Sequence, residues 1–263
     1  MMDNPAISAM LNRKSVRKYT SQQPTDEVIE AVVRAGQQAP FASQTYSFLL
    51  NRKRKNPFGA PLLFTICVDL HKLEMIMERR GWKTVTNNLS LLFFGIQDAA
   101  YAAENMVIAA ESLGMGSCFL GGTPYKAVRI QKQYQLPKRV FPLVELTMGY
   151  PAEEFPPRPR YPLEYTLFED RYPEMTDEMI TAAMKSMDEG YLAQGYYSKQ
   201  KTKINIEVEG KEEAFTYKEY SWTEHISRKW GQWLTDPAEL MDQLAACGFP
   251  IDQTDGKEKT EQA

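Results

Sequence analysis

The sequence predicts a protein that mixes helices with a β-sheet in one large domain with a shorter extension. A continuous apolar run at 62–68, bounded by Pro61 and Asp69, is typical of a strand buried on both faces. Apolar residues at helical spacing lie on either side of it, most clearly at 25–36 and 98–113. The length of 263 residues suits one large domain with an appendage.

The N-terminal part is expected to form two helices and a strand. Asn4 and Pro5 supply a side-chain cap and a proline whose fixed φ suits the first helical turn, and this helix ends near Arg13. Thr25 caps a second helix with acidic residues in its first turn and an apolar face. The segment 39–48 is small and polar, then aromatic, which indicates a loop that enters a short strand.

The middle of the chain is expected to contain the centre of the fold. The run at 62–68 predicts a strand in the middle of the sheet, and a helix follows at 73–81. Asp98 is expected to open a helix to residue 113 that is apolar almost all round, so it is buried centrally or against another subunit. Gly114 is a plausible left-handed cap, and a short strand follows at 117–120.

The remainder is expected to alternate strand, loop and helix. A strand at 143–148 precedes a proline-rich loop at 156–162, and Thr176 caps the next helix. Alternating apolar and polar residues at 204–217, with a turn in the middle, predict a β-hairpin. Asp236, followed by a proline and by a glutamate at the third helical position, starts the last helix.

Composition and charge exclude several classes of protein. With 31 basic and 34 acidic residues, the chain lacks the basic excess of a nucleic-acid-binding protein. Its 3 cysteines are far apart and odd in number, which argues against a disulfide framework and for a reducing compartment. There is no basic, apolar leader and no window long enough for a membrane span. We expect a cytoplasmic protein with no nucleic-acid or membrane partner, and a disordered polar tail at 253–263.

A short basic cluster follows the first helix. Arg13, Lys14, Ser15 and Arg17 bring three cations and a hydroxyl together. Guanidinium groups can each grip two phosphate oxygens, and the serine adds a neutral donor. The alternative is a solvated helix end, where the helix dipole favours cations. A second basic run at 52–55 is interpreted as a solvated turn.

Two other features gain meaning only beside such an anion site. Gly121 and Gly122 stand between a strand and a helix, where backbone N–H groups can approach a ligand with no Cβ in the way. The alternative is a tight turn that needs positive φ. Arg158 and Arg160 lie in the proline-rich loop, whose extended backbone points both the same way. That loop is either a rigid linker or the second side of an anion clamp.

The remaining residues offer little catalytic chemistry. His71 and His225 are the only histidines, and neither has metal-ligand spacing with a cysteine, which disfavours a zinc site and a serine–histidine hydrolase. The P-loop and Rossmann glycine patterns are missing. We therefore nominate no catalytic side chain and expect no metal. A phosphate clamp and a glycine-lined backbone indicate that a cofactor carries the chemistry.

In order and spacing, these motifs resemble the FMN-dependent nitroreductase family. The resemblance rests on the basic cluster, on Ala39 and Pro40, on the stretch 98–116 with the glycine pair after it, and on 149–151 before the two arginines. It covers about residues 5–172. It implies an α+β fold with a mixed, mostly antiparallel sheet flanked by helices, assembled as an intertwined homodimer with FMN at each of two interface sites.

The resemblance also divides the chain into parts. Residues 1–172 would form the FMN-binding domain, and 173–252 a C-terminal extension of helices and a hairpin that packs on the core or on the partner subunit. The helix after Asp98 matches the long central helix of the family's dimer interface.

Cofactor contacts are implied residue by residue. The basic cluster and the two arginines of the proline-rich loop would bind the FMN phosphate, and the backbone of the glycine pair would face the flavin near N5. A loop containing Pro40 and Gln44 would approach the flavin from the partner subunit. In that loop Phe41, Gln44 and Tyr46 replace residues usual in the family, so contacts there are expected to differ. The implied set is Arg13, Lys14, Ser15, Arg17, Pro40, Gln44, Gly121, Gly122, Arg158 and Arg160.

The implied activity is a ping-pong transfer of two electrons. NADPH or NADH would deliver hydride to FMN and leave, and a small electron-poor molecule such as a nitroaromatic or quinone would then take up the electrons. Three alternatives stay open: another flavin reaction on the same scaffold, such as reductive dehalogenation, flavin fragmentation or ring dehydrogenation; an FMN-binding regulatory protein without turnover; and an interaction module whose tryptophan-rich tail docks a partner.

Overall fold

The computed structural model describes residues 4–53 and 55–251, and the predicted disordered tail lies outside them. The chain divides into two compact units, whose boundaries differ from those of the predicted domains. The first unit runs to Phe155 and resumes at Asp236, and the second spans Pro156–Thr235. Residues 236–251 belong to the first unit, where Phe249 packs with Phe141 in a core cluster.

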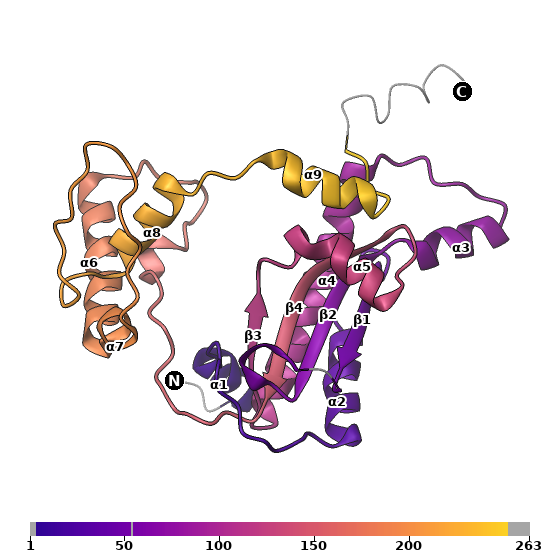
Figure 1. The fold of residues 1–263 in the computed structure, drawn as a ribbon, viewed down its shortest axis with the longest axis horizontal. Helices are drawn as coiled ribbons and strands as arrows, with labels where there is room; N and C mark the ends of the chain where they lie inside the picture. Colours follow the sequence, from indigo (N-terminus) through magenta and orange to yellow (C-terminus); the bar gives the residue numbers. More distant parts are fainter. Residues whose placement is uncertain (1–3, 54, 252–263) are drawn as a thin grey trace. The chain divides into compact units, whose positions relative to one another are not determined.

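A 4-stranded sheet forms the centre of the first unit (Figure 1). Its strands are β1 (Tyr46–Asn51), β2 (Leu62–Asp69), β3 (Gly116–Leu120) and β4 (Val140–Gly149), in the spatial order β1-β2-β4-β3. All their pairings are antiparallel, and an isolated parallel bridge joins Ser15 to Ser117 of β3. Every residue of β2 is buried, and the strand lies between β1 and β4, which confirms the prediction from its apolar run.

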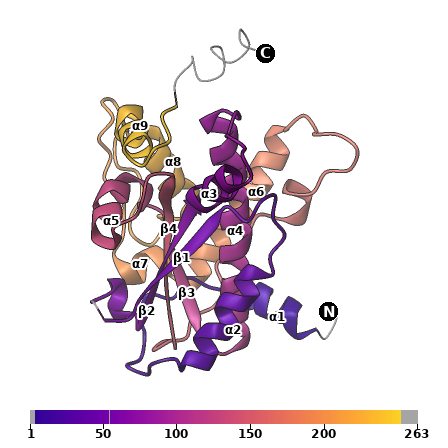
Figure 2. The ribbon, with the colours of Figure 1, turned by 90° about the vertical axis from the view of Figure 1, so that its right-hand side faces the viewer.

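Helices cover the sheet on both faces (Figures 1 and 2). On one face α2 and α4 pack together, and Val32 and Met106 meet Phe64 in the larger core cluster. On the opposite face α5 packs on β4 beside α9. No helix in the part of the chain that the structure describes is long and apolar enough to cross a bilayer. The helices of this unit are α1 (Pro5–Asn12), α2 (Asp26–Gln37), α3 (His71–Arg79), α4 (Asn88–Ser112), α5 (Ala127–Tyr134) and α9 (Pro237–Ala246), with single turns η1 (Pro57–Gly59) and η2 (Pro124–Lys126).

Helix starts predicted from capping residues are confirmed. The side chains of Asn4, Thr25, Thr176 and Asp236 each accept a hydrogen bond from a backbone N–H in the first turn of the helix that follows. Gly114, with φ of 76°, closes α4 as a left-handed residue. These signals are local, so the sequence alone suffices to locate them.

The predicted start of the longest helix at Asp98 is wrong. The helix begins at Asn88, and Asn87 caps it by accepting a hydrogen bond from the N–H of Ser90 at 2.8 Å. Its first turns lack an apolar period because Phe93 and Phe94 are exposed although they are aromatic. Asp98 is instead a buried carboxylate inside the helix.

The second unit has an aromatic core. Its elements are η3 (Leu163–Tyr165), α6 (Asp177–Gln194), α7 (Tyr196–Gln200) and α8 (Trp222–Gln232). Tyr191, Tyr197 and Tyr220 are buried together with Met187. The ring centroids of Tyr197 and Tyr220 are 5.3 Å apart in an edge-to-face pair, and burial raises the pKa of both hydroxyls.

The predicted β-hairpin at 204–217 is wrong, since the described residues of this segment contain no strand. Side chains take the place of a backbone ladder. The N–H of Ile204 donates to the Tyr220 hydroxyl at 3.2 Å, and the N–H of Glu207 donates to Gln232 at 3.0 Å. Gly210, with φ of 79°, does form a turn.

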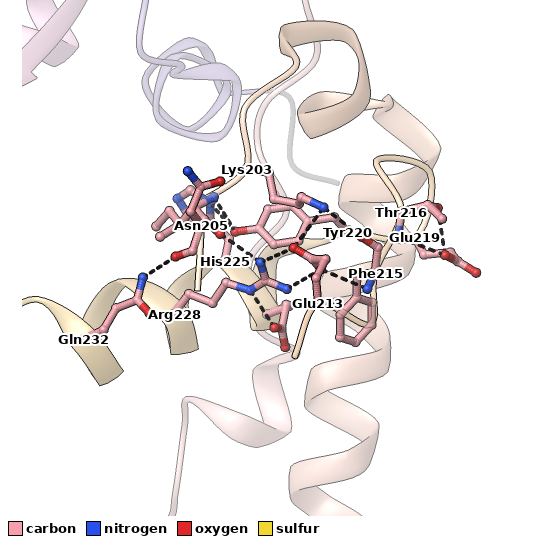
Figure 3. A network of polar contacts seen from close by, with 12 residues as sticks. Lys203, Asn205, Glu213, Phe215, Thr216, Glu219, Tyr220, His225, Arg228 and Gln232 are labelled. Atoms are coloured by element: carbon pink, nitrogen blue, oxygen red, sulfur yellow. Dashed lines mark hydrogen bonds and ion pairs between the residues drawn. The ribbon is translucent and has the colours of Figure 1, made fainter. Parts of the chain in front are cut away.

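Arg228 lies at the centre of the polar network that holds this segment (Figure 3). Its side chain is buried, and it donates two hydrogen bonds of 2.8 Å to the carboxylate of Glu213. Further bonds run to Glu224 at 2.7 Å and to the carbonyl of Ile204 at 2.8 Å. The bonds from Arg228 hold the pKa of Glu213 well below its usual range. A charged side chain therefore holds the segment in which alternating apolar and polar residues predicted a hairpin.

Candidate functional site

The basic cluster lies in an extended segment that docks on the edge of the sheet. Ser15 forms the parallel bridge with Ser117, and the N–H of Val16 donates to the Ser117 carbonyl at 2.8 Å. Val16 is buried against Gly116, where an added Cβ would come within 2.3 Å of the valine side chain. The segment is thereby fixed in register with β3. Since α1 ends at Asn12, the interpretation as a solvated helix end is disfavoured.

The cations of the basic cluster lack a salt-bridge partner among the described residues. Arg13 and Lys14 are half-buried and Arg17 is exposed, and none of them forms a salt bridge within residues 4–53 and 55–251. Arg13 donates to the Ser15 hydroxyl at 3.5 Å, and the Lys14 ammonium lies 5.4 Å from the ring centroid of Phe155. Clustered positive charge on a low-dielectric surface attracts anions. The arrangement therefore suits a phosphate.

The glycine pair follows directly after β3 and is exposed. Neither Gly121 nor Gly122 has positive φ, so the tight-turn alternative that needs such a φ is excluded. A Cβ built on either residue would meet no heavy atom within 4 Å. No described residue requires glycine at these positions, and the bare backbone faces open space that a ligand can use.

Strand β3 connects these two features. Ser117 lies at the start of the strand beside the basic cluster, and Gly121 comes directly after its end. At a rise of roughly 3.3 Å per residue, the strand separates them by about 13 Å. An elongated ligand with an anionic end can span both.

The loop after α2 is held by Asp98 of α4. The Asp98 carboxylate accepts hydrogen bonds from the N–H groups of Ala42 at 2.6 Å, Ser43 at 3.1 Å and Thr45 at 3.0 Å, and from the Thr45 hydroxyl at 2.9 Å. Between these donors, Gln44 adopts a left-handed φ of 53°. The carboxylate therefore fixes the backbone of the loop that the resemblance places near the flavin.

Electrostatics keep Asp98 charged. Burial raises the pKa of its carboxyl, but the hydrogen bonds from Thr45, Ala42 and Ser43 lower it more, so the net pKa lies below its ordinary value. The sequence singled out this residue only as a helix start. A lone aspartate in an apolar helix was the available signal, and its partners lie more than fifty residues away in the sequence.

A cavity of about 560 Å³ lies beside the edge strand β1. Gln44 lines it together with Tyr46 and Phe48, whose rings stack at 5.0 Å, and with Gln37 and Lys72 from two helices. Lys72 donates to the Tyr46 carbonyl at 2.9 Å. Pro40, at the other end of the loop, is exposed. Sequence reasoning missed Gln37 and Lys72 because nothing in their own helices marks them.

Arg158 and Arg160 belong to the second unit. Arg158 donates to Gln194 at 2.7 Å, and its guanidinium lies 4.0 Å from the ring centroid of Tyr196. Arg160 is exposed and donates to the carbonyls of Arg158 and Pro159. That both arginines reach the same anion as Arg13 stays a prediction.

Comparison with known proteins gives a match over most of the first unit. A family model described as the nitroreductase family matches residues 10–51 and 49–150, which include the basic cluster, the loop held by Asp98 and the glycine pair. An FMN reductase (NADPH) of Bacillus subtilis is 32% identical over 192 residues, covering 66% of this chain and 77% of that protein.

Two longer matches extend into the second unit. An NADPH-dependent oxidoreductase of Staphylococcus epidermidis is 25% identical over 266 residues, covering 94% of this chain and 99% of that protein. The solved structure of the nitroreductase NfrA1 from B. subtilis is 27% identical with a TM-score of 0.76, covering 94% of this chain and 100% of that one. The predicted α+β fold, with a mostly antiparallel sheet flanked by helices, is confirmed, and the homodimer stays a prediction.

Proposed function

Because the chain belongs to the nitroreductase family, we propose that it is an FMN-dependent oxidoreductase that transfers two electrons from NADPH or NADH to an electron-poor small molecule. Bound FMN would supply the redox chemistry, taking hydride from the nicotinamide and passing two electrons on. The name of the B. subtilis relative, an FMN reductase with NADPH, favours NADPH as the donor. A nitroaromatic or quinone acceptor follows from the resemblance.

The observation that carries the proposal is the pairing of the basic cluster with the glycine pair along β3. FMN has a phosphate at one end and a flat ring at the other. Ser15 bridges the start of β3, and Gly121 and Gly122 leave the end of the same strand without side chains. The residues present therefore fit both ends of this cofactor.

Each of these residues has a defined task in the proposal. Arg13 and Arg17 donate charge-assisted hydrogen bonds to phosphate oxygens, and Ser15 adds a hydroxyl donor. The glycine backbone offers N–H groups to the ring. Asp98 keeps the loop around Gln44 in one conformation, so that this loop meets its ligand already ordered. No side chain is required as an acid or base.

The functional form in this proposal is a homodimer with FMN at the interface. The outward side of α4 exposes Leu89, Phe93, Phe94 and Tyr101. Large apolar side chains gathered on one helix are typical of a protein interface. Replacing Phe94 with aspartate is expected to give a monomer that binds FMN poorly, measured by light scattering and flavin absorbance. A dimeric, yellow Phe94→Asp variant would contradict this interface.

The first experiment is the absorbance spectrum of the purified protein, followed by addition of NADPH or NADH and then of a nitroaromatic. We expect a flavin spectrum that bleaches with the nicotinamide and returns with the acceptor. A colourless protein that takes up no added FMN would refute the proposal. A flavin that no nicotinamide reduces would favour a regulatory role.

Replacing Arg13 with alanine tests the phosphate contact. Loss of one charge-assisted hydrogen bond is worth about 1.5–3 kcal/mol, so FMN affinity should fall roughly ten- to a hundredfold. The matched control is Lys18→Ala, which removes the same charge from the same segment but from an exposed residue paired with Glu153 at 3.3 Å. Equal losses in both variants would show that net charge, and not position, governs binding.

A further inference from the structure

The last turn of α4 carries a carboxylate where a carboxylate is unfavourable. Glu111 lies at the C-terminal end of this helix, where the dipole disfavours negative charge, and that turn has no basic residue. The residue is half-buried, and its Oε1 is buried without a hydrogen-bond partner among the described residues. Both features cost free energy, so stability alone does not account for a glutamate here.

Glu111 faces the basic cluster. Burial raises the pKa of its carboxyl above the ordinary value, and Glu104 on the same helix adds to the rise. Arg13, the backbone N–H of Lys14 and the Lys14 ammonium oppose that rise from the segment that precedes β3. The hydroxyl of Tyr19, from the same segment, also lies near this carboxylate: burial raises the pKa of that hydroxyl, and Glu111 adds to the rise. Two cations and a carboxylate oxygen thus lie near each other, and within residues 4–53 and 55–251 the cations form no salt bridge and the oxygen, Oε1, no hydrogen bond.

We propose that Glu111 is the internal counter-ion of the phosphate site and takes up one proton when a phosphate dianion binds there. The proposal rests on the proposed function for the identity of that phosphate as part of FMN. In the free protein the carboxylate partly balances Arg13 and Lys14. A bound dianion takes over this role, and its two negative charges then lie near a half-buried carboxylate. Transfer of one proton from solvent to the carboxylate removes the repulsion.

The expected consequence is an FMN affinity that depends on pH through Glu111. Because the protonated carboxyl favours the bound state, this contribution strengthens binding as the pH falls. The phosphate of FMN contributes with the opposite sign near its own second pKa of about 6. Since that contribution is common to every variant, it cancels in the difference between variants, and the pH dependence of that difference isolates Glu111.

The test is a titration of the flavin-free full-length protein with FMN, followed by flavin fluorescence. Glu111→Gln keeps the shape and removes the charge, and the matched control Glu104→Gln removes an exposed charge from the same helix. At pH 8.5 we expect Glu111→Gln to bind FMN about tenfold more tightly than the wild type, equivalent to one pKa unit, and to lose the Glu111-dependent slope. Glu104→Gln should keep the slope. Calorimetry in buffers of different ionisation enthalpy should show more proton uptake for the wild type than for Glu111→Gln.

Unchanged or weaker binding by a folded Glu111→Gln variant, or an unchanged slope, would overturn the proposal and leave Glu111 a structural role. If that variant does not fold, Glu111→Met provides a second neutral side chain of similar length with the same expectation. If the wild type binds no FMN, inorganic phosphate becomes the probe in calorimetry. Phosphate binding with proton uptake that Glu111→Gln lacks would support the counter-ion while refuting the FMN function. Binding of neither ligand would refute both.

Discussion

The two units anchor a loop in opposite ways. In the first, a buried carboxylate, Asp98, collects four hydrogen bonds from a loop that lies on an apolar core of sheet and helices. In the second, a buried guanidinium, Arg228, holds the segment 203–219 over an aromatic core by bonds to the carboxylate of Glu213 and the carbonyl of Ile204. Asp98 adds hydrogen bonds to a loop that already lies on an apolar core. Arg228 instead holds a segment that has no strand pairing of its own.

This difference predicts different sensitivities. Apolar burial responds little to pH or salt, whereas charge-assisted contacts to exposed carboxylates respond to both. Glu213, which receives two bonds from Arg228, is 41% exposed at its side chain. The second unit should therefore be the part that opens first under acid or high salt.

The largest effect is expected at Asp98. Asp98→Ala leaves three backbone N–H groups and a hydroxyl without their acceptor, which should cost about 3–5 kcal/mol of unfolding free energy in the first unit. Urea unfolding measures it. Thr45→Val removes one of the four bonds and should cost only about 1 kcal/mol. Equal losses of unfolding free energy in the two variants would mean that Asp98 stabilises the loop through the Thr45 hydroxyl alone.

A smaller and more local effect is expected at Arg228. Arg228→Met keeps an apolar stem but removes every bond that Arg228 makes to the segment 203–219. Hydrogen-exchange protection of that segment should fall by the equivalent of about 2 kcal/mol, and protection of the sheet should stay unchanged. Arg34→Met is the matched control, because Arg34 pairs with Glu30 across exposed side chains and should change stability by under about 0.5 kcal/mol. Loss of hydrogen-exchange protection throughout the sheet would contradict the expectation that Arg228 stabilises only the second unit.

Acidification should loosen the second unit at a higher pH than the first. Burial, followed by Lys229, lowers the pKa of His225, so the unfolded state binds more protons and stability is lost as the pH falls through the unfolded value of about 6.5. Bonds from Arg228 lower the pKa of Glu213, so its contribution is present above about pH 4.5 and lost below it. Asp98 loses its contribution only in that lower window.

Tryptophan fluorescence against pH measures this difference, because Trp222, Trp230 and Trp233 lie in the second unit and only Trp82 in the first. His225→Gln should remove the change near pH 6.5, and Glu213→Gln the change below about pH 4.5. A single transition that neither substitution moves would show that the two units respond to acid together.

The smallest effect on stability is expected at Gly122. A Cβ there meets nothing within 4 Å, so Gly122→Ala should leave the unfolding free energy within about 0.5 kcal/mol while FMN affinity falls roughly tenfold. Gly116→Ala is the contrast, because its Cβ would lie 2.3 Å from Val16 and should cost about 1–3 kcal/mol. Unchanged FMN affinity in Gly122→Ala would remove the glycine pair from the proposed site.

The predictions that are confirmed depend on residues close together in the sequence, and those that are wrong depend on contacts between distant residues. The cap at Thr25 and the buried run of β2 are confirmed because each is decided within a few residues. The hairpin at 204–217 is wrong because alternating apolar and polar residues indicate only a possible strand pair. The competing bonds of Ile204 with Arg228 and Tyr220 leave no trace in that pattern. The start of α4 was missed because its first turns expose aromatic residues, which hides the period that a buried face would give.

The sequence by itself determined the helix caps, the central strand, the basic cluster at Arg13 to Arg17 and the resemblance that joins them, because these depend on neighbouring residues and their order. Only the tertiary structure decided that Ser15 bridges Ser117, that Asp98 holds the loop at Gln44, and that Glu111 lies near Arg13 and Lys14. The physical reason is that hydrogen bonds and charges act over a few ångströms in space, and folding brings together residues whose separation along the chain leaves no periodic trace.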